Sequence, residues 1–174
     1  MLERLILVAT FTIICMLAAC GDSQEKIAAQ KQKAIANDTL KVLRKIEAAT
    51  QVESSLSQYN QLVIDAKAQV NEAASVLSSD ELKREFESSI EAYADAGMAW
   101  NELDTNGYFQ FGFNEPGESL KKKYNLKLYA KSLTGEATER MVNPNYEREK
   151  RKEVLSIIWA VAKTHVDRAA SLIQ

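Results

Sequence analysis

Very few side chains in this sequence could carry covalent or metal chemistry. It contains two cysteines, Cys15 and Cys20, and one histidine, His165. A thiol can act as a nucleophile, a metal ligand or an acylation site, and an imidazole can transfer protons or bind a metal or haem iron. One histidine does not complete a metal site, and the sequence lacks H-E-x-x-H, C-x-x-C-H and G-x-S-x-G. We therefore expect no metal, no cofactor and no enzyme activity; a hydrolase that uses carboxylates alone is a lesser alternative.

The N-terminal residues have the pattern of an export signal. A short polar start ending in Arg4 precedes an uncharged apolar run from Leu5 to Met16. A helix that spans a bilayer needs about 20 apolar residues, so this run is too short to be retained as a membrane span. Small residues follow it in place of a stop-transfer charge cluster. The pattern predicts that the run is removed by processing.

The four residues Leu17-Ala18-Ala19-Cys20 resemble the lipobox of bacterial lipoproteins. The resemblance implies that residues 1–19 are cleaved as a signal peptide, that the thiol of Cys20 carries a diacylglyceryl group, and that its amine is usually acylated. Two or more acyl chains give stable membrane anchoring. Gly21, in place of an aspartate, resembles the outer-membrane pattern, in which the protein faces the periplasm. A plain secretory signal with an incidental cysteine is the alternative.

Composition and charge are typical of one globular domain over residues 20–174. The chain is 46% hydrophobic and 26% charged, with a net charge of −2. Residues 53–104 hold 11 acidic and 3 basic residues, whereas residues 118–152 hold 5 acidic and 10 basic residues. The basic segment could meet anionic lipid, an acidic partner or the acidic helices of the same molecule, and we favour the last. An acidic, exported protein is not expected to bind nucleic acid.

Hydrophobic periodicity predicts an all-α protein, an antiparallel four-helix bundle with helices at about 23–49, 52–77, 80–104 and 144–173. The first helix begins with sparse apolar residues, which indicates a solvated stalk. Capping pairs Thr50 with Glu53 and Ser78 with Glu81, and Asn143 before Pro144, mark the predicted helix starts. The second helix has a heptad seam that could also form an intermolecular coiled coil; we favour packing within the chain.

Each predicted helix has one apolar face. In the first it comprises Ile35, Leu40, Val42, Leu43, Ile46 and Ala49. The second has Val52, Leu56, Tyr59, Val63, Ala66, Val70, Ala73 and Leu77, and the third has Leu82, Phe86, Ile90, Tyr93, Gly97, Trp100 and Leu103. The last has Val154, Ile158, Val161, His165, Ala169 and Leu172, with Leu155 and Ala162 beside them. Gly97 is costly inside a helix, which indicates a close helix crossing there.

An irregular insertion is predicted at about 105–143, between the third and fourth helices. Its alternating stretches 109–113 and 124–128 could pair as a small hairpin, with a short helix at 119–124 and Asn125 as a left-handed stop. Such an insertion is where we expect function. The candidate residues for binding an envelope protein partner are Phe109, Phe111, Phe113, Lys121, Lys122 and Lys123.

A second candidate site lies within the predicted helices. Tyr93, Trp100, Trp159 and His165 could line a cavity for a small ligand, although a filled core with a hydrogen-bonded structural histidine is the favoured interpretation. The sequence thus predicts a membrane-anchored envelope lipoprotein that acts as a non-catalytic interaction, scaffold or accessory module. A bundle that binds a small ligand is the alternative.

Overall fold

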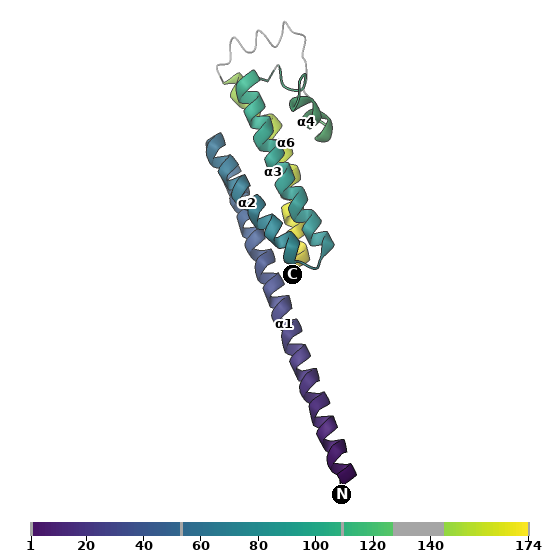
Figure 1. Cartoon of the computed structure of the whole chain (residues 1–174). Helices are drawn as coiled ribbons and strands as arrows, with labels where there is room; N and C mark the ends of the chain where they lie inside the picture. Colours follow the sequence, from purple (N-terminus) through teal and green to yellow (C-terminus); the bar gives the residue numbers. More distant parts are fainter. Residues whose placement is uncertain (1, 53, 109, 127–144, 174) are drawn as a thin grey trace.

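The computed structural model describes residues 2–52, 54–108, 110–126 and 145–173, with side chains from Gln24 onward. The described residues are helical and contain no strand, so the all-α prediction is confirmed (Figure 1). The helices are α1 (Leu2–Thr50), α2 (Leu56–Val76), α3 (Asp80–Asn106), α4 (Gly117–Lys123) and α6 (Tyr146–Ile173). No helix among the described residues has a stretch both long and apolar enough to cross a membrane.

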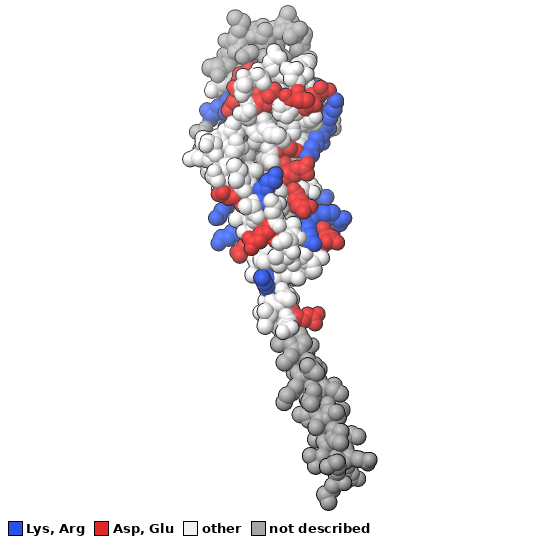
Figure 2. All heavy atoms as spheres, in the orientation of Figure 1, with Lys and Arg blue, Asp and Glu red and all other residues white. Residues whose placement is uncertain are grey.

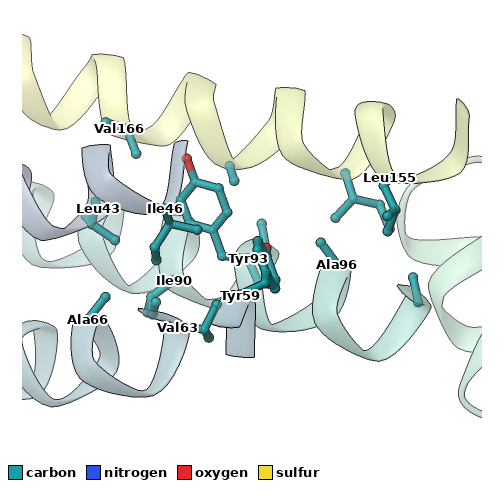
Figure 3. Close-up of a cluster of buried hydrophobic side chains, with 14 of the residues drawn as sticks. Leu43, Ile46, Tyr59, Val63, Ala66, Ile90, Tyr93, Ala96, Leu155 and Val166 are labelled. Carbon is teal, nitrogen blue, oxygen red and sulfur yellow. The ribbon is translucent and has the colours of Figure 1, made fainter. Parts of the chain in front are cut away.

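The four long helices share one hydrophobic core. The backbone of α3 lies close to every other helix, and α2 and α6 each lie close to both α1 and α3. α2 and α6 reach each other through side chains, as in the hydrogen bond between Trp159 and Tyr59. Figure 3 shows side chains from these helices meeting in the core, among them Leu43, Tyr59 and Val166. Burial of apolar surface of this kind is the main driving force for packing.

α1 begins earlier than predicted and ends as predicted. No proline or helix-stopping motif separates the apolar N-terminal run from the polar stretch after it, and the helix runs on to Thr50. Its N-terminal part extends beyond the other helices (Figure 1). From Gln24 to Ala34 every residue is exposed except the half-buried Gln32, and Ile27 is 64% exposed. The solvated start predicted for this helix is confirmed.

The turn from α1 to α2 differs from the predicted capping pair. The Thr50 hydroxyl donates back to the Glu47 carbonyl at 2.7 Å instead of opening a helix. α2 starts after Ser55, whose hydroxyl accepts from the Gln58 amide at 3.2 Å while the Gln58 side chain accepts from the Ser55 amide at 3.0 Å. This is a reciprocal capping box, five residues later than predicted. The heptad seam is buried as predicted, apart from half-buried Leu56 and Val52, which is 67% exposed.

α3 begins at Asp80 as predicted, but its cap lies one residue after the predicted one. The Ser79 hydroxyl, and not that of Ser78, accepts from the Leu82 amide at 3.2 Å. The whole predicted inner face is buried except Trp100, which is half-buried. An added Cβ on Gly97 would lie 2.6 Å from Oδ1 of Asn60, so the glycine sits where α2 and α3 approach closely, as predicted. Contacts on several sides of α3 explain why further residues on it are buried as well.

The buried face of α6 is rotated relative to the prediction. Val161 is 37% exposed and Leu172 is 40% exposed, whereas Ala162 and Val166 are fully buried. Ala162, Val166 and Ala169 are among the buried residues of α6, and α3 is its principal neighbour. Val161 and Ala162 are adjacent and both apolar, so spacing alone does not decide which of them faces the core. The predicted start at Asn143 and Pro144 lies outside the described residues.

Residues 110–116 form turns with one isolated bridge between Phe111 and Asn114, and not a strand of a hairpin. The amide of Phe111 donates to the Gly107 carbonyl, and the amide of Phe113 donates to the Gln110 carbonyl, both at 3.2 Å. Gly107 and Gly112 have positive φ, which bends the backbone. The short helix α4 is confirmed, as is the left-handed stop at Asn125, with φ of 48°. The other side of the proposed hairpin lies partly outside the described residues.

Candidate functional site

Three aromatic rings meet where α2, α3 and α6 converge. The ring centroids of Trp100 and Trp159 are 6.2 Å apart, with an angle of 70° between the rings, and the Tyr59 ring lies 5.7 Å from the first and 6.1 Å from the second. Tyr59 is fully buried, whereas both tryptophans are half-buried. The buried phenol of Tyr59 packs against both indoles, and part of each indole stays exposed to solvent.

Hydrogen bonds hold this cluster in one arrangement. The Tyr59 hydroxyl donates to the backbone carbonyl of Tyr93 at 2.8 Å and accepts from the Trp159 indole nitrogen at 3.2 Å. Burial raises the pKa of Tyr59 far above its ordinary value. The hydrogen bond from Trp159 lowers this pKa in part, and the nearby Tyr93 phenol raises it further. The neutral Tyr59 hydroxyl therefore donates to Tyr93 and, as the acceptor for the indole nitrogen, fixes the orientation of Trp159.

A groove of about 620 Å³ opens above the two indoles. Its walls come from the C-terminal end of α1, the turn after it and the N-terminal half of α6. The residues lining it are Thr50, Gln51, Val52, Ser54, Trp100, Arg148, Arg151, Lys152, Leu155, Ser156 and Trp159. Three of these are cations and none is an acid, so the groove is positive in a chain whose net charge is −2.

Arg151 is oriented by two contacts. Its guanidinium lies 5.5 Å from the centroid of the Trp100 ring, within the range of a cation–π interaction. Nη1 also forms an ion pair with Oδ1 of Asp104 on α3. The acid lies outside the groove lining, so it offsets part of the charge of Arg151 while holding the side chain across the indole.

A second hollow of about 220 Å³ adjoins the groove. The two share Thr50, Gln51, Ser156 and Trp159, and the second adds Glu47, Tyr93, Ala160 and Lys163. Lys163 pairs with Glu47 at 3.1 Å and with Asp167 at 2.9 Å. Both hollows therefore lie along the seam between α1 and α6, and we refer to them together as the seam groove.

Tyr93 has a buried hydroxyl with no hydrogen-bond partner among the described residues. The side chain, which is 1% exposed, extends from α3 toward α6 (Figure 3). Burial, and secondarily the negative charges of Glu47 and Asp167, raise the pKa of this phenol well above its ordinary value. Most buried hydroxyls in proteins are hydrogen-bonded, so a neutral, unpaired one beside a hollow is an unusual feature.

Three of the four residues predicted to form a ligand cavity line the seam groove: Tyr93, Trp100 and Trp159. His165 does not. Its Nδ1 lies 2.7 Å from Oε2 of Glu85, which ties α6 to α3, and it faces a separate hollow of about 350 Å³ beside Lys123 and Tyr124. Its position at the edge of the buried stripe follows from the rotation of α6 described above.

The three phenylalanines predicted to bind a partner are not gathered on one surface. Phe111 is 1% exposed and belongs to the hydrophobic core. Phe113 is 71% exposed. Phe109 lies outside the described residues. Of the two that are described, only Phe113 offers its ring to a partner.

Of the three lysines of α4, one ties that helix to α3. Lys123 bonds to Glu91 at 2.5 Å and to Asp95 at 2.8 Å on α3, while Lys122 pairs with Glu118 at 2.7 Å within α4. Lys121 is half-buried. Burial lowers the pKa of Lys123, but its hydrogen bonds to the two carboxylates outweigh that effect and raise it overall.

These pairs support the favoured interpretation of the charge pattern. Lys123 and Arg151 belong to the basic segment, and their partners Glu91, Asp95 and Asp104 belong to the acidic one. On the face drawn in Figure 2, basic side chains stand beside acidic ones and form no single large patch. Part of the charge asymmetry along the sequence is thus matched inside the molecule.

Sequence reasoning did not connect the cations of α6 with the tryptophans. The signal was present as two adjacent rows on one helical face. Arg148, Lys152 and Ser156 are spaced by four, and so are Arg151, Leu155 and Trp159. The contribution of Thr50 to Ser54 depends on where α1 ends in space, and no local pattern could reveal it.

Comparisons with protein-family models, curated proteins and solved structures found no match to this chain. Among the described residues, no group of three histidine, cysteine or acidic side chains is arranged to hold a metal ion.

Proposed function

We propose that the chain is a lipid-anchored, non-catalytic binding protein of the bacterial envelope, with the lipid on Cys20 and Gly21 directing it to the outer membrane. The observation that carries the proposal is the solvated part of α1, from Gln24 to Ala34, which closely follows the lipobox cysteine. At 1.5 Å per residue, the helix from Cys20 to Ala34 would hold the body about 20 Å from the bilayer. The pairwise packing of α1, α2, α3 and α6 supports an antiparallel four-helix bundle for that body, with an irregular insertion before α6.

The N-terminal peptide of the protein purified from membranes tests the anchor. Mass spectrometry is expected to find a peptide that begins at Cys20 and carries the mass of a diacylglyceryl group. Cys20→Ala should abolish the modification, whereas the matched variant Cys15→Ala, in the run that is removed, should leave it intact. A mature N-terminus elsewhere, or an unmodified Cys20, would refute lipid anchoring.

An envelope protein partner is one ligand for such a module. Among the described candidates in the insertion, Phe113 has the most exposed aromatic ring, and it offers apolar surface for a partner to cover. Crosslinking in intact cells should capture a defined partner whose yield falls in Phe113→Ser and in Cys20→Ala. Equal yields from wild type and Phe113→Ser would place the contact elsewhere.

Binding of a small ligand is a second candidate function, and the seam groove favours it. Its volume lies within the roughly 300 to 1,000 Å³ of small-molecule sites, and its lining combines aromatic rings with a few polar groups. Both tryptophans of the chain, Trp100 and Trp159, line it. Occupation of the groove should therefore change the whole tryptophan fluorescence of the protein.

A further inference from the structure

We infer that the seam groove binds a small amphipathic anion, in which a carboxylate or phosphate group is joined to a flat apolar ring. The inference rests on the proposed ligand-binding function and names the chemistry of its ligand. It follows from three features of the described residues: the sign of the charge, the exposed aromatic surface and the unpaired hydroxyl of Tyr93.

The cations select for an anion. Arg148, Arg151 and Lys152 line the larger hollow, which has no acid among its lining residues. The one acid that lines the smaller hollow, Glu47, is paired with Lys163 at 3.1 Å. Arginine presents a planar fork that matches the oxygens of carboxylate and phosphate, and lysine adds a mobile point charge. Asp104 cancels part of the charge of Arg151 but also holds its guanidinium in place. The side chain of Arg151 therefore loses less conformational entropy when a ligand binds.

The indoles select for a flat apolar group. The rings of Trp100 and Trp159 both pack against Tyr59, and the indole nitrogen of Trp159 also donates to the Tyr59 hydroxyl, so the exposed parts of the two indoles form a rigid surface. Arg151 lies over the Trp100 ring, which places positive charge next to the apolar surface. A ligand that joins a flat ring to an anionic group would contact the apolar surface and the positive charge at the same time.

The Tyr93 hydroxyl is an independent indication that the groove receives a ligand. It is buried, has no partner among the described residues, and belongs to a side chain that lines the inner hollow. A buried hydroxyl left without a partner destabilises the protein, and a ligand atom that accepts a hydrogen bond from it would remove this cost. The hydroxyl can serve as this donor because its raised pKa keeps it neutral.

The groove is remote from the membrane that would hold Cys20. It lies at the C-terminal end of α1, and Thr50 is 30 residues along the helix from Cys20, about 45 Å at 1.5 Å per residue. Headgroups of the anchoring leaflet are therefore out of reach. The ligand is expected to be a free molecule on the periplasmic side.

Tryptophan fluorescence of the full chain, purified in detergent, provides the test. The probes are phenyl phosphate, benzoate, benzyl alcohol and inorganic phosphate. We expect saturable quenching by phenyl phosphate or benzoate. Benzyl alcohol should bind at least roughly tenfold more weakly because it lacks the charge, and inorganic phosphate should do so because it lacks the apolar ring. Which of the two anions binds more tightly distinguishes a phosphate ligand from a carboxylate ligand.

A double variant, Arg148→Gln with Lys152→Gln, should weaken binding of the anionic probe by at least roughly tenfold and leave binding of benzyl alcohol unchanged. Lys122→Gln is the matched control, since it removes an exposed cation on α4, outside the groove. Circular dichroism melting checks that each variant is folded.

Two results would overturn the inference in distinguishable ways. One such result is that benzyl alcohol binds as tightly as the anions and the double variant has no effect, or that inorganic phosphate binds as tightly as phenyl phosphate. The groove would then bind ligands without selecting amphipathic anions. If no probe gives saturable quenching, both the inference and the ligand-binding function are refuted, whereas lipid anchoring at Cys20 stands or falls by its own test.

Discussion

Tyr59 and Tyr93 show how one residue type serves two purposes in this protein. Both phenols are buried, and burial is the main reason that the pKa of each is raised. The Tyr59 hydroxyl makes two hydrogen bonds, to Tyr93 and from Trp159, while the Tyr93 hydroxyl makes none among the described residues. The Tyr59 hydroxyl thus links α2, α3 and α6, whereas the Tyr93 hydroxyl is an unpaired donor beside a hollow.

Removing these two hydroxyls should have opposite consequences. Tyr59→Phe leaves the Trp159 indole nitrogen without its acceptor and should lower the free energy of unfolding by about 1–2 kcal/mol. Tyr93→Phe removes a hydroxyl that has no partner among the described residues and should leave stability unchanged or slightly higher. Urea unfolding followed by circular dichroism measures both. Equal destabilisation by the two variants would show that the Tyr93 hydroxyl is satisfied in solution.

At the scale of elements, α4 is held to α3 by one buried carboxylate. Asp95 is 6% exposed and accepts from the Tyr124 hydroxyl at 2.6 Å, with Lys123 at 2.8 Å from the same oxygen. Burial and the hydrogen bond to Asp95 raise the pKa of Tyr124 well above its ordinary value, so it remains a donor throughout the neutral range. A helix of seven residues is too short to be stable alone, and these contacts hold it in place.

Asp95→Ala should release α4 without unfolding the long helices. The change leaves the Tyr124 hydroxyl and the Lys123 ammonium without this shared partner, at a cost of about 2 kcal/mol. Amide hydrogen exchange should become fast in Gly117–Lys123 and stay slow in the core of α3. Glu118→Gln, which disrupts only an exposed pair within α4, is the control and should change neither. Unchanged exchange in Asp95→Ala would show that the apolar contacts of α4 and the pair between Lys123 and Glu91 are enough to hold it.

For the molecule as a whole, the buried phenols link folding to alkaline pH. Tyr59, Tyr93 and Tyr124 have raised pKa values in the folded state, whereas in the unfolded chain they titrate near 10.0. Below that pH both states hold the protons, and stability does not depend on these groups. Above it the unfolded state loses protons that the folded state keeps, so stability falls as pH rises.

We therefore expect the free energy of unfolding to decline above about pH 10, by up to about 1.4 kcal/mol per pH unit for each phenol. Tyrosinate absorbance from these residues should appear together with loss of helix, because they ionise only on unfolding. The combined variant Tyr93→Phe and Tyr124→Phe should reduce the slope. Absorbance that rises fully before any helix is lost would show that the phenols are accessible in the folded protein.

Much of the helical architecture could be predicted because it depends on local order. The seam of α2 and the inner face of α3 are long, regular and built from large apolar residues, and Asn125 stops a helix by its own backbone preference. The caps were harder, since the true caps at Ser55 and Ser79 differ from plausible alternatives by only a few residues. The apparent strand at 109–113 was misleading because alternation over so few residues does not exclude turns.

The sequence by itself determined the lipobox expectation, the helical class and the residues of most buried faces, all of which follow from short-range spacing. Only the tertiary structure decided which face of α6 is buried, since Val161 and Ala162 are adjacent apolar residues and spacing alone does not choose between them. It also decided that Trp100 and Trp159 stand beside Arg148, Arg151 and Lys152 while His165 does not. A site built across a seam depends on where distant helices meet, and that is a property of the packed core.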